Sequence, residues 1–251
     1  MRLTVVLPTY NEADNLPRMV RELLALELPG HELSILVVDD NSPDGTGALA
    51  DALAAEHKGR VGVVHRAGKE GLGKAYVDGF QRALAAGTGL VLQMDCDFSH
   101  QPRFIPEMLV ALDGADMVLG SRFTPGGRVD PHWAWWRKLL SWFANSLYVR
   151  AILGTELHDA TGGFRLWRAQ TLRGMDIGRR IHSNGYVFQV EMAYVASRLG
   201  YRIREIPIEF PDRRAGESKM SVKIQLEAAS RVFEVRKRHR LLTPADRAAG
   251  G

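Results

Sequence analysis

The sequence predicts an α/β fold in which a mostly parallel sheet carries helices on both faces. Five short apolar runs divide the first 120 residues, and amphipathic segments separate them. Continuous apolar runs are typical of strands buried on both faces, and their alternation with helical segments indicates parallel strands joined by crossover helices. The predicted strands are Leu3–Pro8, Leu33–Val38, Val61–His65, Leu90–Met94 and Asp116–Gly120.

Helical periodicity marks the segments that separate these strands. From Leu16 to Leu24, apolar residues recur at i, i+3, i+4, i+7 and i+8, which is the stripe of a helix packed on one side. Pro17 belongs in the first turn, so the helix begins near Asp14 or Asn15, either of which can cap it. Further helices are predicted at Thr46–His57, Lys74–Ala86 and Arg103–Leu112.

Beyond Gly120 the pattern is less regular, and its clearest elements are a helix near Phe188–Leu199 and a strand-like segment at 202–210. Residues 213–240 contain nine Lys or Arg and three Glu, a local charge of +6 against +4 for the whole chain. We expect one main domain over 1–221, a basic, amphipathic C-terminal helix over 222–240 that binds a membrane surface or a partner, and a frayed tail over 241–251.

Length and composition exclude several classes of protein. With 251 residues, 45% of them hydrophobic and 25% charged, the chain has the balance of a globular protein. The single cysteine, Cys96, permits no intrachain disulfide, and no His or Cys spacing predicts a structural zinc. No signal peptide or apolar run of membrane-spanning length is evident, so we expect a cytoplasmic protein. A pI near 9.3 favours anionic partners.

Polar segments follow the predicted strands at their carboxyl ends, where ligands of parallel sheets bind. They read PTYNE, DDNSPDG, AGKEGLGK and DCDFSH, and we expect all four to converge on one rim of the sheet. In the second, Asp39 and Asp40 are adjacent, so one carboxylate can enter the turn while the other accepts hydrogen bonds from a base or ribose. A loop that only caps the next helix is an equal alternative.

Asp95 and Asp97 end the fourth predicted strand, and their spacing of two residues puts both carboxylates on one side of an extended chain. Mg²⁺ and Mn²⁺ take carboxylate oxygens and share their remaining positions with substrate phosphates, which suits a nucleotide diphosphate. The alternative is helix capping, with Ser99 shortly before Pro102.

Two further segments have competing interpretations. GKEGLGK, residues 68–74, matches the spacing of a P-loop, but Ala75 follows where a P-loop needs a hydroxyl, so a helix N-terminus with close backbone approach is favoured. In residues 132–150, one helical face is aromatic and aliphatic, which indicates either a helix docked on the core or one lying in a bilayer interface. That face comprises Trp133, Trp136, Leu140, Phe143 and Leu147.

Nine motifs in order resemble the polyprenol (dolichol) phosphate mannose synthases, inverting family-2 glycosyltransferases with a GT-A fold. They are PTYNE, DDNSPDGT, GLGKA, MDCDFSH, GSRF, RKLLS, TGGFR, GYVFQVE and GESK, and the match runs from about Leu3 to Ser221. This resemblance implies transfer of mannose from GDP-mannose to a membrane polyprenyl phosphate. It also implies that 1–221 is the catalytic domain, that the protein lies peripherally on the cytoplasmic face of a membrane, and that nucleic acid is not a partner.

The resemblance assigns roles to residues at the matching positions. The nucleotide-sugar set is Pro8, Tyr10, Glu12, Asp39, Asp40, Asp95, Cys96 and Asp97, and the acceptor-phosphate set is Arg122, Arg137, Ser141, Arg213 and Lys219. Asp97 would hold Mg²⁺ or Mn²⁺, and Asp95, Asp97 and Arg122 form the implied catalytic set. Some members have Gln at the position of Ser99, which is the implied second protein ligand of the metal.

One class of the family carries transmembrane helices after the catalytic domain, whereas this chain continues into a basic helix. It therefore resembles the class that depends on peripheral attachment or on a separate membrane-anchoring subunit. Three rival functions remain: the same fold with UDP-glucose as donor, a P-loop NTPase, and a non-enzymatic adaptor built on the basic C-terminus. For the proposed transfer, Arg122, Arg137 and Lys219 should lie close to the corner formed by Asp95 and Asp97.

Overall fold

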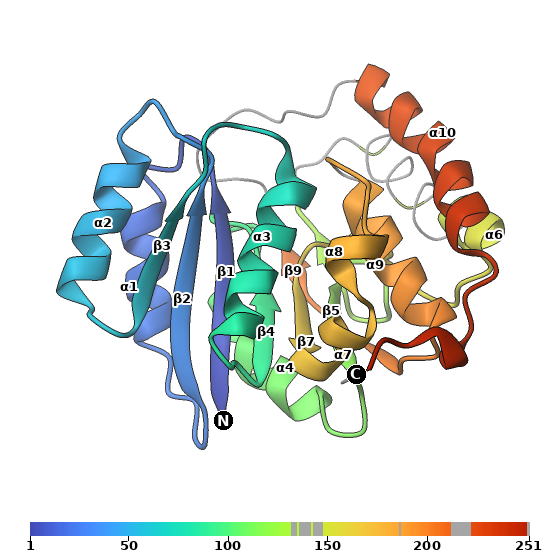
Figure 1. The fold of residues 1–251 in the computed structure, drawn as a ribbon, viewed down its shortest axis with the longest axis horizontal. Coiled ribbons are helices and arrows are strands. Elements are labelled where there is room, and N and C mark those ends of the chain that lie inside the picture. Colours follow the sequence, from blue (N-terminus) through green and yellow to red (C-terminus); the bar gives the residue numbers. More distant parts are fainter. Residues whose placement is uncertain (132–134, 136–141, 143–147, 186, 212–221, 250–251) are drawn as a thin grey trace.

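A mixed seven-stranded sheet forms the centre of the protein (Figure 1). The computed structural model describes residues 1–131, 135, 142, 148–185, 187–211 and 222–249, with the backbone alone for 222–229. The strand order is β3-β2-β1-β4-β7-β5-β8, and all neighbouring pairs are parallel except those of β7, which is antiparallel to β4 and β5. The strands are β1 (Arg2–Thr9), β2 (Glu32–Asp39), β3 (Val61–His65), β4 (Leu90–Gln93), β5 (Met117–Ser121), β7 (Arg165–Arg168) and β8 (Ile203–Pro207).

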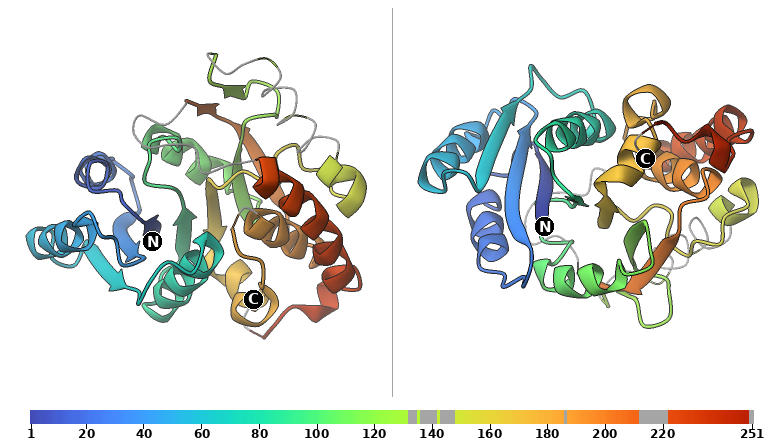
Figure 2. Two further views of the ribbon diagram at one scale, coloured as in Figure 1. Left: turned by 90° about the horizontal axis from the view of Figure 1, so that it is seen from above. Right: turned by 60° about the horizontal axis from the view of Figure 1, so that its bottom comes forward.

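Helices cover both faces of this sheet, as Figure 2 shows. Alternation along β1 sends Leu3, Val5 and Leu7 into the core under α1 and α4, while Val6 enters the core under α3 and α9. The helices are α1 (Leu16–Leu24), α2 (Thr46–Glu56), α3 (Leu72–Ala85), α4 (Ile105–Ala111), α6 (Arg150–Leu153), α7 (Ala169–Gly174), α8 (Ile177–Arg180), α9 (Val187–Arg198) and α10 (Val222–His239). A small parallel pair, β6 (Arg128–Val129) with β9 (Glu209–Phe210), lies apart from the main sheet.

The five predicted strands and the predicted helices are confirmed within one or two residues at most ends. The segment Arg103–Leu112 divides into a short 3₁₀ helix, η1 (Pro102–Phe104), and α4. The helix α1 begins with Asn15 at the N-cap position, as predicted, but Asn15 makes no side-chain capping bond and instead donates from Nδ2 to Glu12 Oε2 at 2.7 Å. The strand β7 was not predicted from the sequence.

The C-terminal tail is packed against the domain rather than frayed. A capping box between Thr243 and Asp246 forms the 3₁₀ helix η3 (Pro244–Asp246). Arg247 then donates from Nε to the Leu199 carbonyl at 2.9 Å, and its guanidinium lies 4.2 Å from the centroid of the Tyr201 ring. Because these bonds satisfy carbonyls at the end of α9, the tail closes that helix, and the expectation of a frayed end is wrong for residues 243–248.

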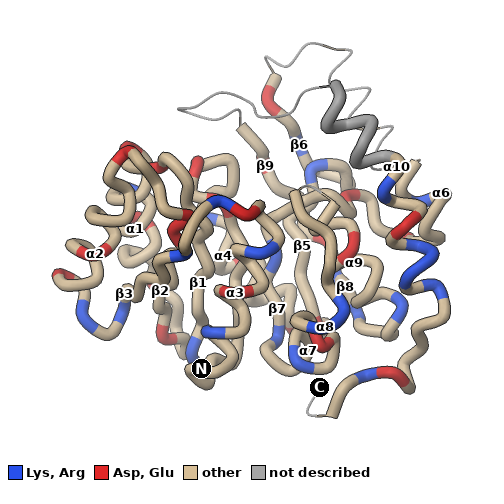
Figure 3. Tube along the Cα trace, turned by 45° about the horizontal axis from the view of Figure 1, so that its top comes forward, with Lys and Arg blue, Asp and Glu red and all other residues tan. Residues whose placement is uncertain are grey.

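The basic C-terminal helix is confirmed as α10, and it is amphipathic. Val232, Val235 and His239 are buried at i, i+3 and i+7, facing α9. Phe233, by contrast, is 55% exposed, and the positive residues Arg236, Lys237 and Arg240 are exposed as well. Figure 3 shows Lys and Arg positions along the described part of this helix and just beyond it. Among the described residues, no helix is both long and apolar enough to cross a membrane.

Candidate active site

The four polar loops converge on the carboxyl-terminal rim of the parallel strands, as predicted. The loop after β1 contacts the loop after β2, since the Asn11 N–H donates to Ser42 Oγ at 3.1 Å. It also meets the glycine-rich loop after β3, because the Lys69 ammonium lies 3.9 Å from the centroid of the Tyr10 ring. These contacts place Tyr10 between two loops at the rim.

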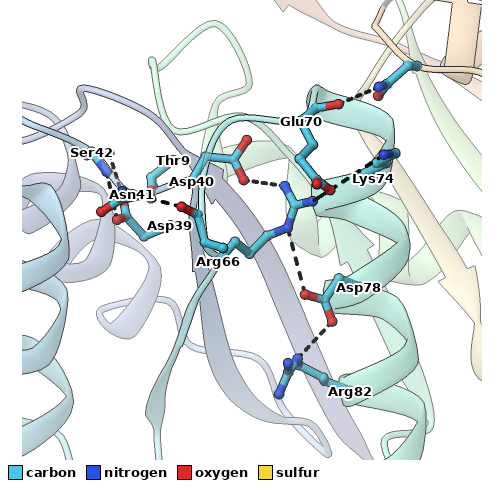
Figure 4. A network of polar contacts seen from close by, with 12 residues as sticks. Thr9, Asp39, Asp40, Asn41, Ser42, Arg66, Glu70, Lys74, Asp78 and Arg82 are labelled. Carbon is cyan, nitrogen blue, oxygen red and sulfur yellow. Dashed lines mark hydrogen bonds and ion pairs between the residues drawn. The ribbon is translucent and has the colours of Figure 1, made fainter.

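Asp39 and Asp40 have different environments. Asp39 is buried and turned into its own loop, where it accepts from Thr9 Oγ1 at 3.1 Å and from Ser42 Oγ at 2.6 Å. Asp40 is also buried, and it pairs with the Arg66 guanidinium, as Figure 4 shows. Burial raises the pKa of Asp40 despite the opposing effect of Arg66. Asp39 therefore stabilises the turn after β2, while Asp40 belongs to a charged network.

Arg66 is the centre of that network and was not singled out from the sequence. Its Nη2 lies 3.1 Å from Glu70 Oε2 and its Nε lies 3.8 Å from Asp78 Oδ2, so one arginine ties the loop after β2 to the glycine-rich loop and to α3 (Figure 4). Its side chain is only 9% exposed. A buried guanidinium shared by several carboxylates holds these loops in one arrangement.

The glycine-rich segment at residues 68–74 leads into α3, which begins at Leu72. Gly73 packs so closely that an added Cβ would lie 2.6 Å from the Ser183 carbonyl oxygen. Lys74 lies on the exposed side of α3, with its Nζ 3.5 Å from Glu70 Oε2. Gly73 thus serves close helix packing, as favoured from the sequence.

The carboxylates of Asp95 and Asp97 follow β4 and are held by different neighbours. Ser99 donates to Asp97 Oδ1 twice, from Oγ at 2.5 Å and from its N–H at 3.1 Å. Ser99 therefore orients Asp97 through the hydroxyl that was expected to bind the metal. Cys96 is buried in the hydrophobic core, and burial raises the pKa of its thiol, so its side chain does not reach the rim.

Asp95 rests between two buried aromatic residues. Tyr76 Oη donates to Asp95 Oδ1 at 2.7 Å, and burial together with the Asp95 charge raises the pKa of Tyr76 well above its ordinary value. The Asp95 N–H donates to His100 Nδ1 at 2.8 Å, which places the imidazole proton on Nε2 in the neutral ring. Burial lowers the pKa of His100, which favours that neutral form. Neither Tyr76 nor His100 was assigned a role from the sequence.

Arg122 forms a buried ion pair with Asp159, which lies in the segment DATGGFR. Its Nε and Nη2 each donate to the Asp159 carboxylate at 2.7 Å, and Nη2 also donates to Thr161 Oγ1 at 2.8 Å. The guanidinium lies 5.1 Å from the centroid of the Phe210 ring, which packs edge-on against His100. Arg122 is thus near the corner of Asp95 and Asp97, but Asp159 offsets its charge.

The other predicted site residues are placed as follows. Pro8 is half-buried at the end of β1, and Glu12 begins the turn into α1, where its carbonyl accepts from the N–H groups of Asn15 and Leu16. Four members of the acceptor set lie outside the described residues: Arg137, Ser141, Arg213 and Lys219. The predicted aromatic helix face at 132–147 also lies outside them, although Trp135 and Trp142 are described and exposed.

A divalent cation fits this corner only if a ligand completes its coordination. Within the described part of the chain, no group of three or more His, Cys, Asp or Glu could hold a metal ion alone. The donors present are the hard carboxylate oxygens of Asp95 and Asp97. Mg²⁺ in particular is held by one or two carboxylates plus substrate phosphates and water, so this donor set suits an ion shared with a diphosphate.

Comparison with known proteins identifies the family. Residues 4–174, more than half of the chain, match the family described as glycosyl transferase family 2. The chain belongs to glycosyltransferase family 2. This glycosyltransferase is 48% identical over 232 residues to an undecaprenyl-phosphate mannosyltransferase of Micrococcus luteus, covering 92% of this chain and 93% of that protein. It is 44% identical over 250 residues to a polyprenol monophosphomannose synthase of Mycolicibacterium smegmatis, covering 99% and 91% of the two chains.

Solved structures confirm the GT-A fold. Mannosyl-3-phosphoglycerate synthase from Rubrobacter xylanophilus superimposes with a TM-score of 0.64 at 20% identity, over 95% of this glycosyltransferase and 73% of that chain. Glucosyl-3-phosphoglycerate synthase from Mycobacterium tuberculosis, solved with Mn²⁺ and UDP-glucose, gives 0.64 at 19% identity, over 95% and 79%. The enzyme class excludes the P-loop NTPase and the non-enzymatic adaptor.

Proposed function

We propose that this glycosyltransferase moves mannose from GDP-mannose to a polyprenyl monophosphate at a membrane surface. The observation that carries the proposal is the 48% and 44% identity, over more than 90% of each chain, to an undecaprenyl-phosphate mannosyltransferase and a polyprenol monophosphomannose synthase. The rim supports it, because it gathers Tyr10, Asp40 and the Asp95–Asp97 corner within one loop cluster.

The donor binds along this rim. Tyr10 and Asp40 contact the nucleoside, with Pro8, Glu12 and Asp39 shaping the loops around it. Asp97, held by two hydrogen bonds from Ser99, and Asp95 face the pyrophosphate. Mg²⁺ or Mn²⁺ bound there supplies positive charge that stabilises the leaving diphosphate. The fold is shared with a glycosyltransferase solved with Mn²⁺ and a nucleotide sugar, which supports a divalent cation as cofactor.

The acceptor approaches with its own negative charge, which the protein must offset. Arg122, Arg137, Ser141, Arg213 and Lys219 form the proposed acceptor-phosphate set. Because a phosphate monoester with a second pKa near about 6 is mostly a dianion at neutral pH, the nucleophile is already charged and no general base is required. Its in-line attack at the anomeric carbon inverts that centre, and the protein's contribution is electrostatic.

The test is direct transfer of label to a lipid. Purified protein is incubated with radiolabelled GDP-mannose, Mg²⁺ and a short polyprenyl phosphate, and organic-extractable radioactivity is measured. Asp97→Ala should lose at least about 100-fold, because the charge that holds the metal is removed. An arm with labelled UDP-glucose separates the donor alternatives. Absence of transfer from GDP-mannose, or equal transfer from UDP-glucose, would overturn the donor assignment.

The pH dependence of mannosyl transfer should follow from protonation of the acceptor phosphate. We expect kcat/KM to fall about tenfold per unit as the pH drops below about 6, since the acceptor phosphate then takes up a proton. The matched variants His158→Gln and His65→Gln change titratable side chains outside the proposed binding sets and should leave this acidic limb in place. A limb that moves when an enzyme side chain is substituted would contradict the mechanism.

A further inference from the structure

Asp95 is the exposed end of a buried polar pair. Its side chain is 31% exposed, whereas Tyr76, whose Oη donates to Asp95 Oδ1 at 2.7 Å, is completely buried. The bond therefore joins a carboxylate at the rim to a phenol inside the domain. A buried hydroxyl costs free energy unless it is hydrogen-bonded, so this phenol is matched to one specific acceptor.

The Tyr76 ring is held by both helices that flank it. It stacks on Phe188 with ring centroids 5.8 Å apart and an interplanar angle of 4°. It also packs against Phe80, with centroids 5.6 Å apart. Phe80 lies in α3 with Tyr76 itself, and Phe188 lies in α9, so the position of the hydroxyl is determined by packing between two elements.

The backbone of Asp95 is held from the opposite side. His100 Nδ1 accepts the Asp95 N–H at 2.8 Å, and the imidazole is stacked on Phe164 with centroids 5.2 Å apart. With its main chain held by His100 and Oδ1 held by Tyr76, Asp95 retains one carboxylate orientation. Oδ2, which lies 3.9 Å from His100 Nδ1, is then the oxygen left for a ligand at the rim.

We propose that Tyr76 is a positioning residue, whose hydroxyl holds Oδ1 of Asp95 so that Oδ2 is available to the divalent cation that accompanies the donor diphosphate. The inference rests on the proposed function and adds a residue to its site. Hydrogen-bond partners of metal-site ligands typically contribute about 10- to 100-fold in metal affinity or activity. Tyr76 makes no direct contact with the ligand in this scheme, so its effect passes through Asp95.

The test uses Tyr76→Phe, which keeps the ring and its stacking on Phe188 and removes only the hydroxyl. Isothermal titration of Mn²⁺ into the full-length protein with saturating GDP measures the dissociation constant of the ion without any transfer reaction. We expect Tyr76→Phe to raise that constant about 10- to 100-fold and to lower kcat similarly, with the KM for polyprenyl phosphate unchanged. The control is Tyr194→Phe, which changes a second buried tyrosine, in α9. It should match the wild type in the Mn²⁺ dissociation constant, in kcat and in the KM for polyprenyl phosphate.

A double-mutant cycle separates positioning from a general structural effect. If Tyr76 acts through Asp95, adding Tyr76→Phe to Asp95→Asn should weaken Mn²⁺ binding no further than Asp95→Asn alone. Additive losses, or wild-type Mn²⁺ affinity and kcat in Tyr76→Phe, would overturn the inference. The inference would also be overturned if Tyr76→Phe lost Mn²⁺ affinity only in proportion to a lowered melting temperature. Wild-type protein that binds no Mn²⁺ with GDP would instead overturn the proposed donor site itself.

Discussion

Arg122 illustrates how a neighbouring charge changes the electrostatic role of a residue. The motif GSRF assigns it to a phosphate, but in the fold its side chain is 12% exposed and paired with Asp159, which is fully buried. Burial alone would raise the pKa of Asp159, yet the Arg122 guanidinium and its hydrogen bonds hold that pKa below the ordinary value. The positive charge is therefore largely compensated. Arg122 therefore joins the loop after β5 to the segment that holds Asp159 and Thr161, in addition to its place in the proposed acceptor-phosphate set.

We expect loss of the Arg122–Asp159 ion pair to lower the stability of the protein strongly. Asp159→Asn leaves a buried guanidinium without its counter-charge, so we expect the free energy of unfolding to fall by about 3 to 5 kcal/mol. Chemical denaturation followed by circular dichroism measures it. The control is Glu22→Gln, which removes the exposed partner of Arg18 and should change stability by less than about 1 kcal/mol. A loss in Asp159→Asn as small as that of the control would contradict a stabilising pair.

At the scale of elements, Glu191 connects three segments that are distant in sequence. Its Oε2 accepts from the N–H of His182 at 2.9 Å, in the segment that packs on the glycine-rich loop. Its Oε1 accepts from Arg238 Nη1 at 2.6 Å and from His239 Nε2 at 2.8 Å, both in α10. One buried carboxylate in α9 thus joins the C-terminal helix to the loop beside α3.

The pH dependence of stability follows from this carboxylate. Burial opposes its ionisation, but hydrogen bonds from His239, Ser183 and Arg238 lower the pKa of Glu191 to about 2. A lowered folded-state pKa contributes stability that is present above the unfolded value near 4.5 and is lost as the pH falls from there toward about 2. Glu191→Gln should therefore reduce the free energy of unfolding at pH 7 by on the order of 3 kcal/mol.

The deficit of Glu191→Gln relative to the wild type should shrink when unfolding is measured at pH 3.5. Denaturant titrations of both proteins at the two pH values test this. The control is Glu234→Gln, an exposed residue of α10, for which we expect little difference at either pH. A deficit for Glu191→Gln that is equal at both pH values would show that the carboxylate charge does not stabilise the junction.

At the scale of the whole molecule, α10 and the residues after it combine exposed basic side chains with exposed apolar ones. The exposed faces of α10 and the residues after it carry Arg236, Lys237, Phe233 and Leu241, the last of which is 81% exposed. The helices α1 and α2 lie at the other end of the sheet (Figure 1). Basic residues beside exposed apolar ones are typical of surfaces that attach to anionic membranes. We propose that α10 is the end of the molecule that meets the lipid.

We expect the protein to bind vesicles of phosphatidylcholine and phosphatidylserine, with an affinity that falls as salt is added. Each basic residue near an anionic surface contributes about 1 kcal/mol, so the double variant Arg236→Ala/Lys237→Ala should weaken binding about 30-fold. Arg21→Ala/Lys58→Ala removes two exposed positive charges from α1 and the end of α2 and is the control. Vesicle sedimentation measures both. Equal losses in the two variants would rule out α10 as the attachment surface.

The sequence by itself determined the alternation of strands and helices, the rim where the polar loops meet, and the corner of Asp95 and Asp97. Each depends on neighbours within a few residues, where the periods of strand and helix and the spacing of carboxylates are directly legible. The antiparallel β7 was missed because its four residues, Arg165–Arg168, are too short a run to show a strand pattern, and the strand forms only between β4 and β5.

Only the tertiary structure shows which polar side chains pair with one another. Arg66 pairs with Asp40, Tyr76 with Asp95, and Asp159 with Arg122. The members of each pair are between 19 and 37 residues apart. No local pattern specifies which of many charged or aromatic residues meets which across such a separation. The packed sheet brings them together, and burial then makes each pairing matter, because an ion or hydroxyl removed from water is stable only with its partner.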